Sequence, residues 1–194
     1  MMGLKRILVW LWRIRRCRGF GVQSPWAYGM VRYVINEHWP YYAYEPLRRT
    51  FPGVDAVTRR LCELCLRLAN RVRPSAALLH GVDGRMFGSY VMAGCRCTAC
   101  CSDVGECVRK CDGGAVMAVI APGQGFADAY GSVVKMAADG SAVILVGIHG
   151  DKAMRRLWRE VVARQEGVVT FDLYYCGLVC FDAKRYKQNY IINF

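Results

Sequence analysis

The sequence lacks any long hydrophobic run, and this lack limits where the protein is expected to work. Its strongest apolar stretch, residues 7–12, is short and lies between Lys5, Arg6 and Arg13. A membrane-spanning helix needs about 20 apolar residues, and a secretory signal ends in a small-residue cleavage site. Neither pattern is present, so the sequence predicts a cytoplasmic protein with no transmembrane segment.

Acidic residues are scarce in the first part of the chain. Residues 1–75 carry 14 Lys/Arg against 4 Asp/Glu, whereas residues 76–194 carry 13 against 11. A positive field of this kind attracts nucleic-acid phosphates, anionic lipid head groups or acidic proteins. The alternative is a basic surface that is merely solvated. A nucleic acid or another anionic partner is therefore one expectation for the N-terminal region.

The chain also lacks internal repeats and low-complexity segments. Its 194 residues are 54% hydrophobic and 22% charged, which is typical of one globular domain with a modest extension. We expect residues 1–50 to form a basic helical extension and residues 51–194 to form the domain.

Cysteine is abundant, with 11 residues in the chain. Without an export signal, disulfides are not expected, and most should be free thiols. Four thiolates at close spacing can hold a tetrahedral zinc. Free cysteines are more often buried core residues, so we expect no metal, with zinc as the alternative. Cys62 and Cys65 form one closely spaced pair, and Cys65 lies on the apolar face of a predicted helix. Cys95 and Cys97 alternate as on a strand. They begin a second cluster that continues with Cys100, Cys101, Cys107 and Cys111.

The first 50 residues show two helical patterns. Residues 1–19 predict a basic amphipathic helix that packs on its own domain or, as the alternative, lies on an anionic membrane. Its apolar stripe consists of Leu4, Ile7, Leu8, Leu11 and Ile14, and its arginines Arg13, Arg15, Arg16 and Arg18 follow. Ser24 and Pro25 predict the start of a second helix over residues 26–37. Residues 38–44 form an aromatic connection whose rings either stack on a ligand or pack under the helices.

From residue 55 onward, helical and strand patterns alternate. A helix is expected over residues 55–72, and buried strands over 76–80, 95–101, 115–120 and 142–148. Residues 81–88 are expected to form a glycine-rich turn into a helix that continues through residue 93, and further helices are expected over 125–138 and 152–165. Residues 168–174, 177–181 and 190–194 predict antiparallel strands. Such alternation predicts an α/β fold, with a three-layer, Rossmann-like, mostly parallel sheet.

Ligands bind such sheets beyond the carboxyl ends of the strands, where the strand order reverses. Gly81, Asp83 and Gly84 lie in the glycine-rich stretch of residues 81–88, which directly follows the first strand. This stretch does not have the dinucleotide-binding spacing. Asp103, with Glu106 close by, follows the second strand, where an acidic residue normally binds a ribose.

The tip of the fourth predicted strand offers His149 and Asp151 as candidate catalytic residues. A histidine there is a candidate general base. Asp151 has an alternative role as the cap of the following helix.

Several stretches resemble a bacterial subgroup of class I S-adenosylmethionine-dependent methyltransferases that carry an N-terminal helical extension. The matching stretches, in order, are residues 19–28 (GFGVQSPWAY), 40–45 (PYYAYE), 66–70 (LRLAN) with Pro74, then Ile148, His149, Met154 and Trp158, and finally 171–174 (FDLY) and 177–179 (GLV). The resemblance implies S-adenosylmethionine as the cofactor, held by Gly81, Asp83, Gly84 and Asp103. It also implies transfer of a methyl group to an unknown acceptor, of the O-methyltransferase type, with His149 as base.

The chain departs from this family where the chemistry is expected. Leu79 stands where members place an acidic residue before the first glycine, and Val146 and Gly147 replace a pair of aspartates that metal-using relatives use as ligands. The chain between residues 95 and 115 is also too short for one strand, which we infer to be the outermost of the family's sheet. The alternative function is therefore a catalytically inactive fold that serves as a binding or scaffold module for an anionic partner.

Overall fold

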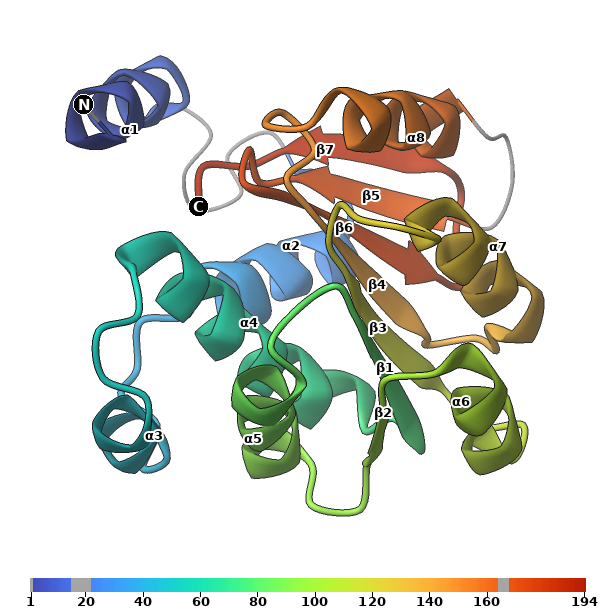
Figure 1. Cartoon of the computed structure of the whole chain (residues 1–194). Coiled ribbons are helices and arrows are strands. Elements are labelled where there is room, and N and C mark those ends of the chain that lie inside the picture. The colour runs from blue at the N-terminus through green and yellow to red at the C-terminus, as the bar shows by residue number, and fades with distance from the viewer. Residues whose placement is uncertain (1, 15–21, 164–167) are drawn as a thin grey trace.

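The computed structural model describes residues 2–14, 22–163 and 168–194, and these form a three-layer α/β fold (Figure 1). Its seven-stranded sheet has the order β2-β1-β3-β4-β6-β5-β7. The strands are β1 (Ala76–His80), β2 (Ala99–Cys101), β3 (Val116–Ile120), β4 (Ala142–Val146), β5 (Val168–Asp172), β6 (Cys176–Phe181) and β7 (Gln188–Ile191). The predicted fold class is confirmed.

Eight α-helices and one π-helical segment accompany the sheet in the described part of the chain. They are α1 (Met2–Trp12), α2 (Pro25–Met30), η2 (Val31–Ile35), α3 (Tyr44–Thr50), α4 (Ala56–Val72), α5 (Gly84–Gly94), α6 (Val104–Cys111), α7 (Phe126–Met136) and α8 (Lys152–Ala163). None of the helices among these residues is long and apolar enough to cross a bilayer.

Pairing within the sheet is mostly parallel. β2, β1, β3 and β4 run in the same direction, and β6 pairs antiparallel with both β4 and β5. The expected antiparallel pairing near the C-terminus is thus confirmed, while β7 adds to β5 in parallel. Because β6 alone is reversed in the described sheet, the carboxyl ends of the other strands share one edge, which we call the carboxyl edge.

Alternating strand residues feed two separate cores, as the pleat of a strand requires. One core lies under α2, η2, α4 and α5 and takes Ala77, Leu79 and Val119 from the sheet. The other lies under α6, α7 and α8 and takes Leu78 and Ala118. Residues of the predicted extension and of the predicted domain both contribute to the first core.

Local signals explain several helix starts. The hydroxyl oxygen of Ser24 accepts a hydrogen bond from the backbone N–H of Ala27, and Pro25 occupies the first helical position, as predicted. Asp55 caps α4 in the same way, through the N–H groups of Val57 and Thr58. These caps explain why both helices begin where the sequence indicated.

Three sequence predictions need correction here. The strand expected over residues 95–101 is shorter, because Cys95 and Cys97 lie in a turn before β2. Helix α6 follows this short edge strand directly, and helix α3 follows the aromatic connection; neither was expected. β2 is the edge strand on this side of the described sheet.

The third correction concerns the N-terminal helix. Its apolar stripe was expected to pack on the domain, yet Ile7, Leu8, Leu11 and Ile14 are exposed, while Arg13 is buried. The prediction failed because helical periodicity identifies an apolar face without telling which surroundings cover it. Arg15, Arg16 and Arg18 lie outside the described residues.

Candidate functional site

The strand order of the sheet reverses between β1 and β3, at the carboxyl edge. From β1 the chain moves outward to β2 and then returns to the other side of β1 as β3. Gly81, at the tip of β1, has a φ of 71°, and a Cβ added there would lie 3.1 Å from the carbonyl oxygen of Ala121. Only glycine fits this approach without strain. Ligands of such sheets bind beyond this edge, at the point where the strand order reverses.

The imidazole of His80 lies at the same reversal point of the sheet. Its Nε2 lies 3.0 Å from the carbonyl oxygen of Gln124. This contact ties the loop that follows β3 to the tip of β1.

Each acidic candidate residue caps a helix at the carboxyl edge. The carboxylate of Asp83 accepts a hydrogen bond from the backbone N–H of Met86 at 3.0 Å, and that of Asp103 accepts one from the backbone N–H of Glu106 at 2.9 Å. The other carboxylate oxygen of each residue has no hydrogen-bond or ion-pair partner among the described residues. Both residues are exposed. Each therefore combines a capping role with a free acceptor oxygen.

Asp151 caps α8 through the N–H of Met154, at 2.7 Å. This is the alternative role that the sequence offered for it. Its catalytic role stays a prediction.

His149 lies at the tip of β4 and contacts the tip of β5. Its Nε2 is 2.8 Å from Oδ2 of Asp172, and its ring stacks on that of Tyr174 with 5.2 Å between centroids. The side chain of His149 is 33% exposed and that of Asp172 is 14% exposed. A partly exposed histidine held by a carboxylate is the arrangement of an oriented general base.

Arg13 connects the N-terminal helix to this pair. Its guanidinium donates to Oδ1 of Asp172 at 2.9 Å and to the backbone oxygen of Asp172 at 3.0 Å. It also lies over the ring of Tyr174, 5.3 Å from the centroid. With a side chain only 3% exposed, Arg13 forms a buried ion pair with Asp172.

Opposing influences set the pKa of Asp172. Burial raises it, but the hydrogen bonds from Arg13 and His149 outweigh burial, so the pKa lies below the ordinary value for aspartate. Asp172 is therefore a carboxylate at neutral pH and can only accept hydrogen bonds. It follows that Nε2 of His149 is the donor, and that Nδ1 carries the lone pair when the ring is neutral.

The turn that presents Tyr174 is strained. Tyr174 has a φ of 69°, a value that non-glycine residues rarely adopt, and the N–H of Tyr175 donates to the oxygen of Leu173 across it at 3.0 Å. Oδ1 of Asp172 supports the turn by accepting from the N–H of Tyr174 at 2.8 Å. Strained residues of this kind cluster at functional sites.

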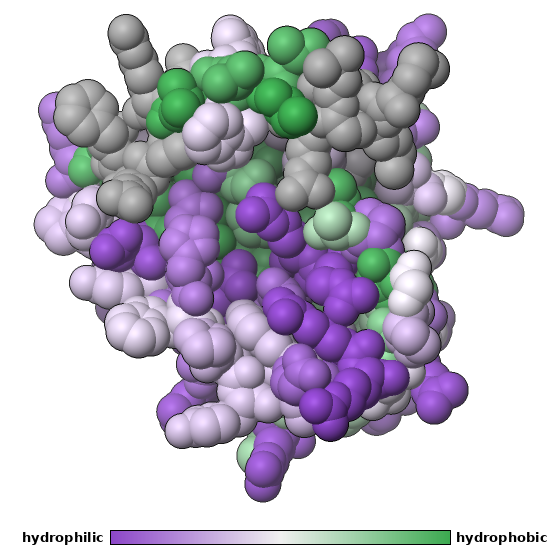
Figure 2. Space-filling view, turned by 90° about the vertical axis from the view of Figure 1, so that its left-hand side faces the viewer, coloured by the Kyte–Doolittle hydropathy of each residue, from purple (hydrophilic) through white to green (hydrophobic). Residues whose placement is uncertain are grey.

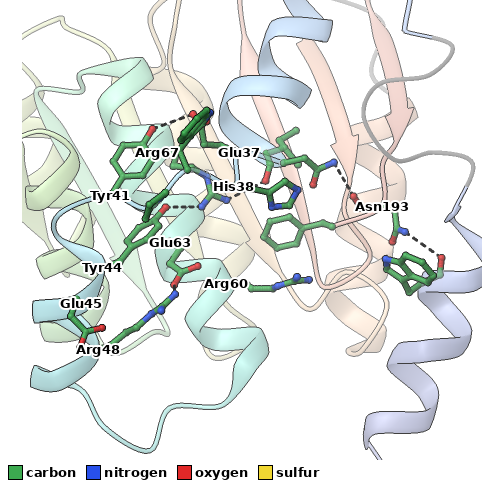
Figure 3. A pocket seen from close by; sticks show the side chains of 16 residues that line it. Glu37, His38, Tyr41, Tyr44, Glu45, Arg48, Arg60, Glu63, Arg67 and Asn193 are labelled. Carbon is green, nitrogen blue, oxygen red and sulfur yellow. Dashed lines mark hydrogen bonds and ion pairs between the residues drawn. The ribbon is translucent and has the colours of Figure 1, made fainter.

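A pocket of about 540 Å³ opens between α3, α4 and the end of η2 (Figure 3). This volume suits a small-molecule ligand. Its wall is built from aromatic side chains and charged groups, among them Trp39, Tyr41, Tyr44, Arg48, Arg60 and Arg67. The sequence did not predict this pocket, although residues 38–44 were proposed as possible stacking residues.

Arg67 is the buried cation of this pocket. Its guanidinium, 5% exposed, donates to the backbone oxygens of Val34 and Ile35 and to the hydroxyl of Tyr44. Arg48 pairs with Glu63 at 2.7 Å. Figure 3 shows Arg60 reaching into the pocket, where it makes no hydrogen bond or ion pair with the residues drawn. The pocket is also lined by Glu37, Glu45 and Glu63, so it places charges of both signs beside aromatic rings. Arg60 is the cation that can meet an anionic group of a planar ligand.

A second hollow of about 240 Å³ shares Trp10, Arg60, Asn193 and Phe194 with the first and reaches Tyr175. The ring of Tyr175 meets that of Tyr174 edge-on, at 5.1 Å between centroids. Tyr174 in turn stacks on His149. Packed aromatic rings therefore connect the wall of this hollow to the His149–Asp172 pair.

The described cysteines are free thiols, as predicted. Burial raises the pKa of Cys62 and Cys107 to about 12, so these sulfurs stay protonated. No group of three or more Cys, His, Asp or Glu side chains in the described residues is placed to hold a metal ion. Cys65, expected on the buried face of α4, is indeed buried.

No protein-family profile and no curated protein matches the sequence. The site must therefore be judged from its own geometry.

The structure separates the candidate residues into two groups along the carboxyl edge. Gly81, Asp83 and Gly84 lie at the tip of β1 and Asp103 lies just beyond β2, while His149 and Asp151 follow β4. Sequence reasoning missed Arg13 and Asp172 as members of the second group. The one available signal was a charged residue, Asp172, at the end of an otherwise apolar strand.

Proposed function

We propose that the chain is an S-adenosylmethionine-dependent methyltransferase of the O-methyltransferase type. The observation that carries the proposal is the His149–Asp172 pair, which lies on the same edge of the sheet as Gly81. A base and a cofactor site at one edge are what methyl transfer to a hydroxyl group requires. The three-layer α/β fold with a mostly parallel sheet supports the proposal further.

The residues at the tips of β1 and β2 fit this cofactor. S-adenosylmethionine supplies an electrophilic methyl group on a positively charged sulfonium and also carries an ammonium group. The exposed carboxylates of Asp83 and Asp103 each have a free oxygen, which suits the ammonium group and the ribose hydroxyls respectively. Gly81 and Gly84 allow the backbone to approach closely.

His149 acts as the base on the acceptor side. The Asp172 carboxylate fixes the proton on Nε2, so Nδ1 receives the proton of the acceptor hydroxyl. The acceptor lies in the aromatic pocket and the hollow beside Tyr175, where Arg60 contacts its anionic group. Asp172 is a positioning residue, because it acts through His149.

Calorimetry with S-adenosylmethionine tests the cofactor half of the proposal. We expect measurable binding, and about tenfold weaker binding by Asp83→Asn/Asp103→Asn, since two charge-assisted contacts are lost. Asp112→Asn is the matched control, because Asp112 is an exposed aspartate at the C-terminal end of α6, away from the carboxyl edge. Absence of binding at millimolar ligand contradicts the proposal, as does equal affinity of the double variant and the wild type.

One observation favours a second function, a catalytically inactive fold that binds an anionic partner such as nucleic acid. The Asp83 carboxylate already occupies an N-terminal amide of α5, which such folds otherwise offer to an anionic part of a ligand. Arg13 does not serve this function, because it is buried against Asp172.

Salt-dependent retention on a heparin column tests this alternative. Replacement of the exposed Arg32, Arg60 and Arg71 by alanine should lower both retention and its salt dependence, if the N-terminal half carries the anion-binding surface. A triple variant of α8, Lys152→Ala/Arg156→Ala/Arg159→Ala, removes the same charge elsewhere. Equal losses from the two variants would show a general charge effect and reject this function.

A further inference from the structure

Helix α1 is oriented with its apolar side outward. Ile7, Leu8, Leu11 and Trp12 are 51–73% exposed, whereas Arg13 is 3% exposed. Trp10 and Ile14 are also largely exposed. In Figure 2, apolar side chains of α1 form a band along the top of the face that is turned to the viewer. A surface helix of a globular protein normally shows the opposite arrangement.

Polar contacts hold α1 in this orientation. Arg13 donates to Asp172, and the side-chain amide of Asn193 donates to the backbone oxygen of Trp10 at 3.2 Å. These contacts use the inward side of the helix and leave the apolar side free. Water contact with several neighbouring large apolar groups is unfavourable, and such patches commonly mark interaction sites.

The charge of the sequence that contains α1 indicates what covers the helix. The first 36 residues contain seven basic residues and no acidic residue. The basic residues are Lys5, Arg6, Arg13, Arg15, Arg16, Arg18 and Arg32, of which Arg13 is already paired with Asp172. A second copy of the chain would bring the same positive charge to the interface and be repelled. Nucleic acid offers phosphates but little apolar surface for Ile7, Leu8 and Leu11.

We propose that α1 lies on the surface of an anionic lipid bilayer. Apolar residues enter the boundary between head groups and acyl chains, tryptophans lie at head-group level, and basic residues meet the lipid charges. The buried Arg13–Asp172 ion pair then fixes the bound helix to the sheet. This inference is independent of the proposed methyl transfer, because it needs neither a cofactor at Gly81 nor His149 as a base.

Co-sedimentation of the full chain with vesicles tests the inference. We expect binding to vesicles of phosphatidylcholine mixed with phosphatidylglycerol, weaker binding to pure phosphatidylcholine, and a decrease with salt. Leu8→Ser/Leu11→Ser should weaken the binding by about tenfold or more, because two large apolar groups no longer enter the bilayer. Fluorescence of the exposed tryptophans should shift to shorter wavelength when anionic vesicles are added.

Met92→Ser/Val108→Ser is the matched control, because these two side chains are apolar and similarly exposed on α5 and α6. It should bind vesicles as the wild type does. Equal vesicle binding by the α1 variant and the control would overturn the inference. So would a wild-type dimer, in the absence of lipid, that the α1 variant converts to a monomer, since a second copy would then cover α1.

Discussion

The two halves of the carboxyl edge differ in how they hold their charged side chains. At the tips of β1 and β2, Asp83 and Asp103 are exposed, and one carboxylate oxygen of each caps a helix by accepting a backbone hydrogen bond. At the tips of β4 and β5, Asp172 is largely buried and receives hydrogen bonds from both Arg13 and His149. The first half has acceptor oxygens left for a ligand, whereas the second half is already ordered by its own contacts.

This difference indicates that the two halves of the edge suit different roles, one in ligand binding and one in holding a base. An exposed carboxylate that caps a helix can accept a further hydrogen bond from a ligand without breaking an existing contact. The β1–β2 half therefore suits a ligand that must bind and dissociate. A buried ion pair is costly to disrupt, so the β4–β5 half suits a base that must keep one orientation. The same ion pair also holds α1, which links the base to the proposed membrane-facing helix.

The largest predicted effect comes from breaking the buried pair. Asp172→Asn leaves the Arg13 guanidinium buried without a counter-charge, so it should lower the free energy of unfolding by about 3–5 kcal/mol. Urea denaturation measures this loss. Arg13→Met/Asp172→Asn should lose less than Asp172→Asn alone, because it leaves no unpaired charge. If Asp172→Asn lowers the free energy of unfolding by less than about 1 kcal/mol, the ion pair behaves as an ordinary surface pair. The two halves of the edge would then not differ in how firmly they hold their charges.

The pH dependence of stability sharpens this prediction. Because the pKa of Asp172 is lower in the folded chain than its ordinary value of 3.8, its contribution is complete above pH 3.8. The contribution is lost as the pH falls below that value through the folded-state pKa. The difference in stability between wild type and Asp172→Asn should therefore be constant near neutrality and shrink in acid. A difference that stays constant to the lowest pH would contradict the lowered pKa.

A smaller effect is expected at the tip of β1. Gly81→Ala places a Cβ 3.1 Å from the oxygen of Ala121 at a φ of 71°, so it should cost about 1–2 kcal/mol. Gly131→Ala in α7 meets nothing within 4 Å and should stabilise the chain by about 0.5–1 kcal/mol. Thermal unfolding compares the two. The same sign for both variants would mean that the close approach of β1 and β3 is not required.

The smallest effects are expected from the caps. Asp83→Ala and Asp103→Ala should each cost about 1 kcal/mol, the usual value of a helix cap. Glu160→Ala removes an exposed acidic residue from α8 and should change stability by less than about 0.5 kcal/mol. Chemical denaturation measures the free energy of unfolding of the three variants and so ranks their stabilities. A loss at Asp83 comparable to that at Asp172 would erase the difference between exposed and buried charge.

Local signals account for the parts of the fold that the sequence predicted. Ser24 and Pro25 started a helix, Pro74 ended one, and continuous apolar runs became β1, β3 and β4. Each of these signals acts over a few residues. Helix α6 was missed because it has only eight residues, and its cysteines, Cys107 and Cys111, were weighed as zinc ligands or buried side chains.

Long-range contacts account for the parts that it did not predict. Arg13 meets Asp172 across 159 residues, and His149 meets Asp172 across 23. Periodicity assigned Arg13 to a solvent-facing cluster, whereas its ion pair with Asp172 decided the orientation of α1. The pocket around Arg67 likewise depends on how η2, α3 and α4 meet, which no local pattern specifies.

Amide NMR of the full-length, isotope-labelled chain, titrated with S-adenosylmethionine, tests the central claim most directly. The account predicts that the largest shifts fall on residues 81–84 and on Asp103, with smaller shifts around His149. Shifts confined to the pocket around Tyr44 and Arg67, or no shifts at saturating ligand, would contradict it.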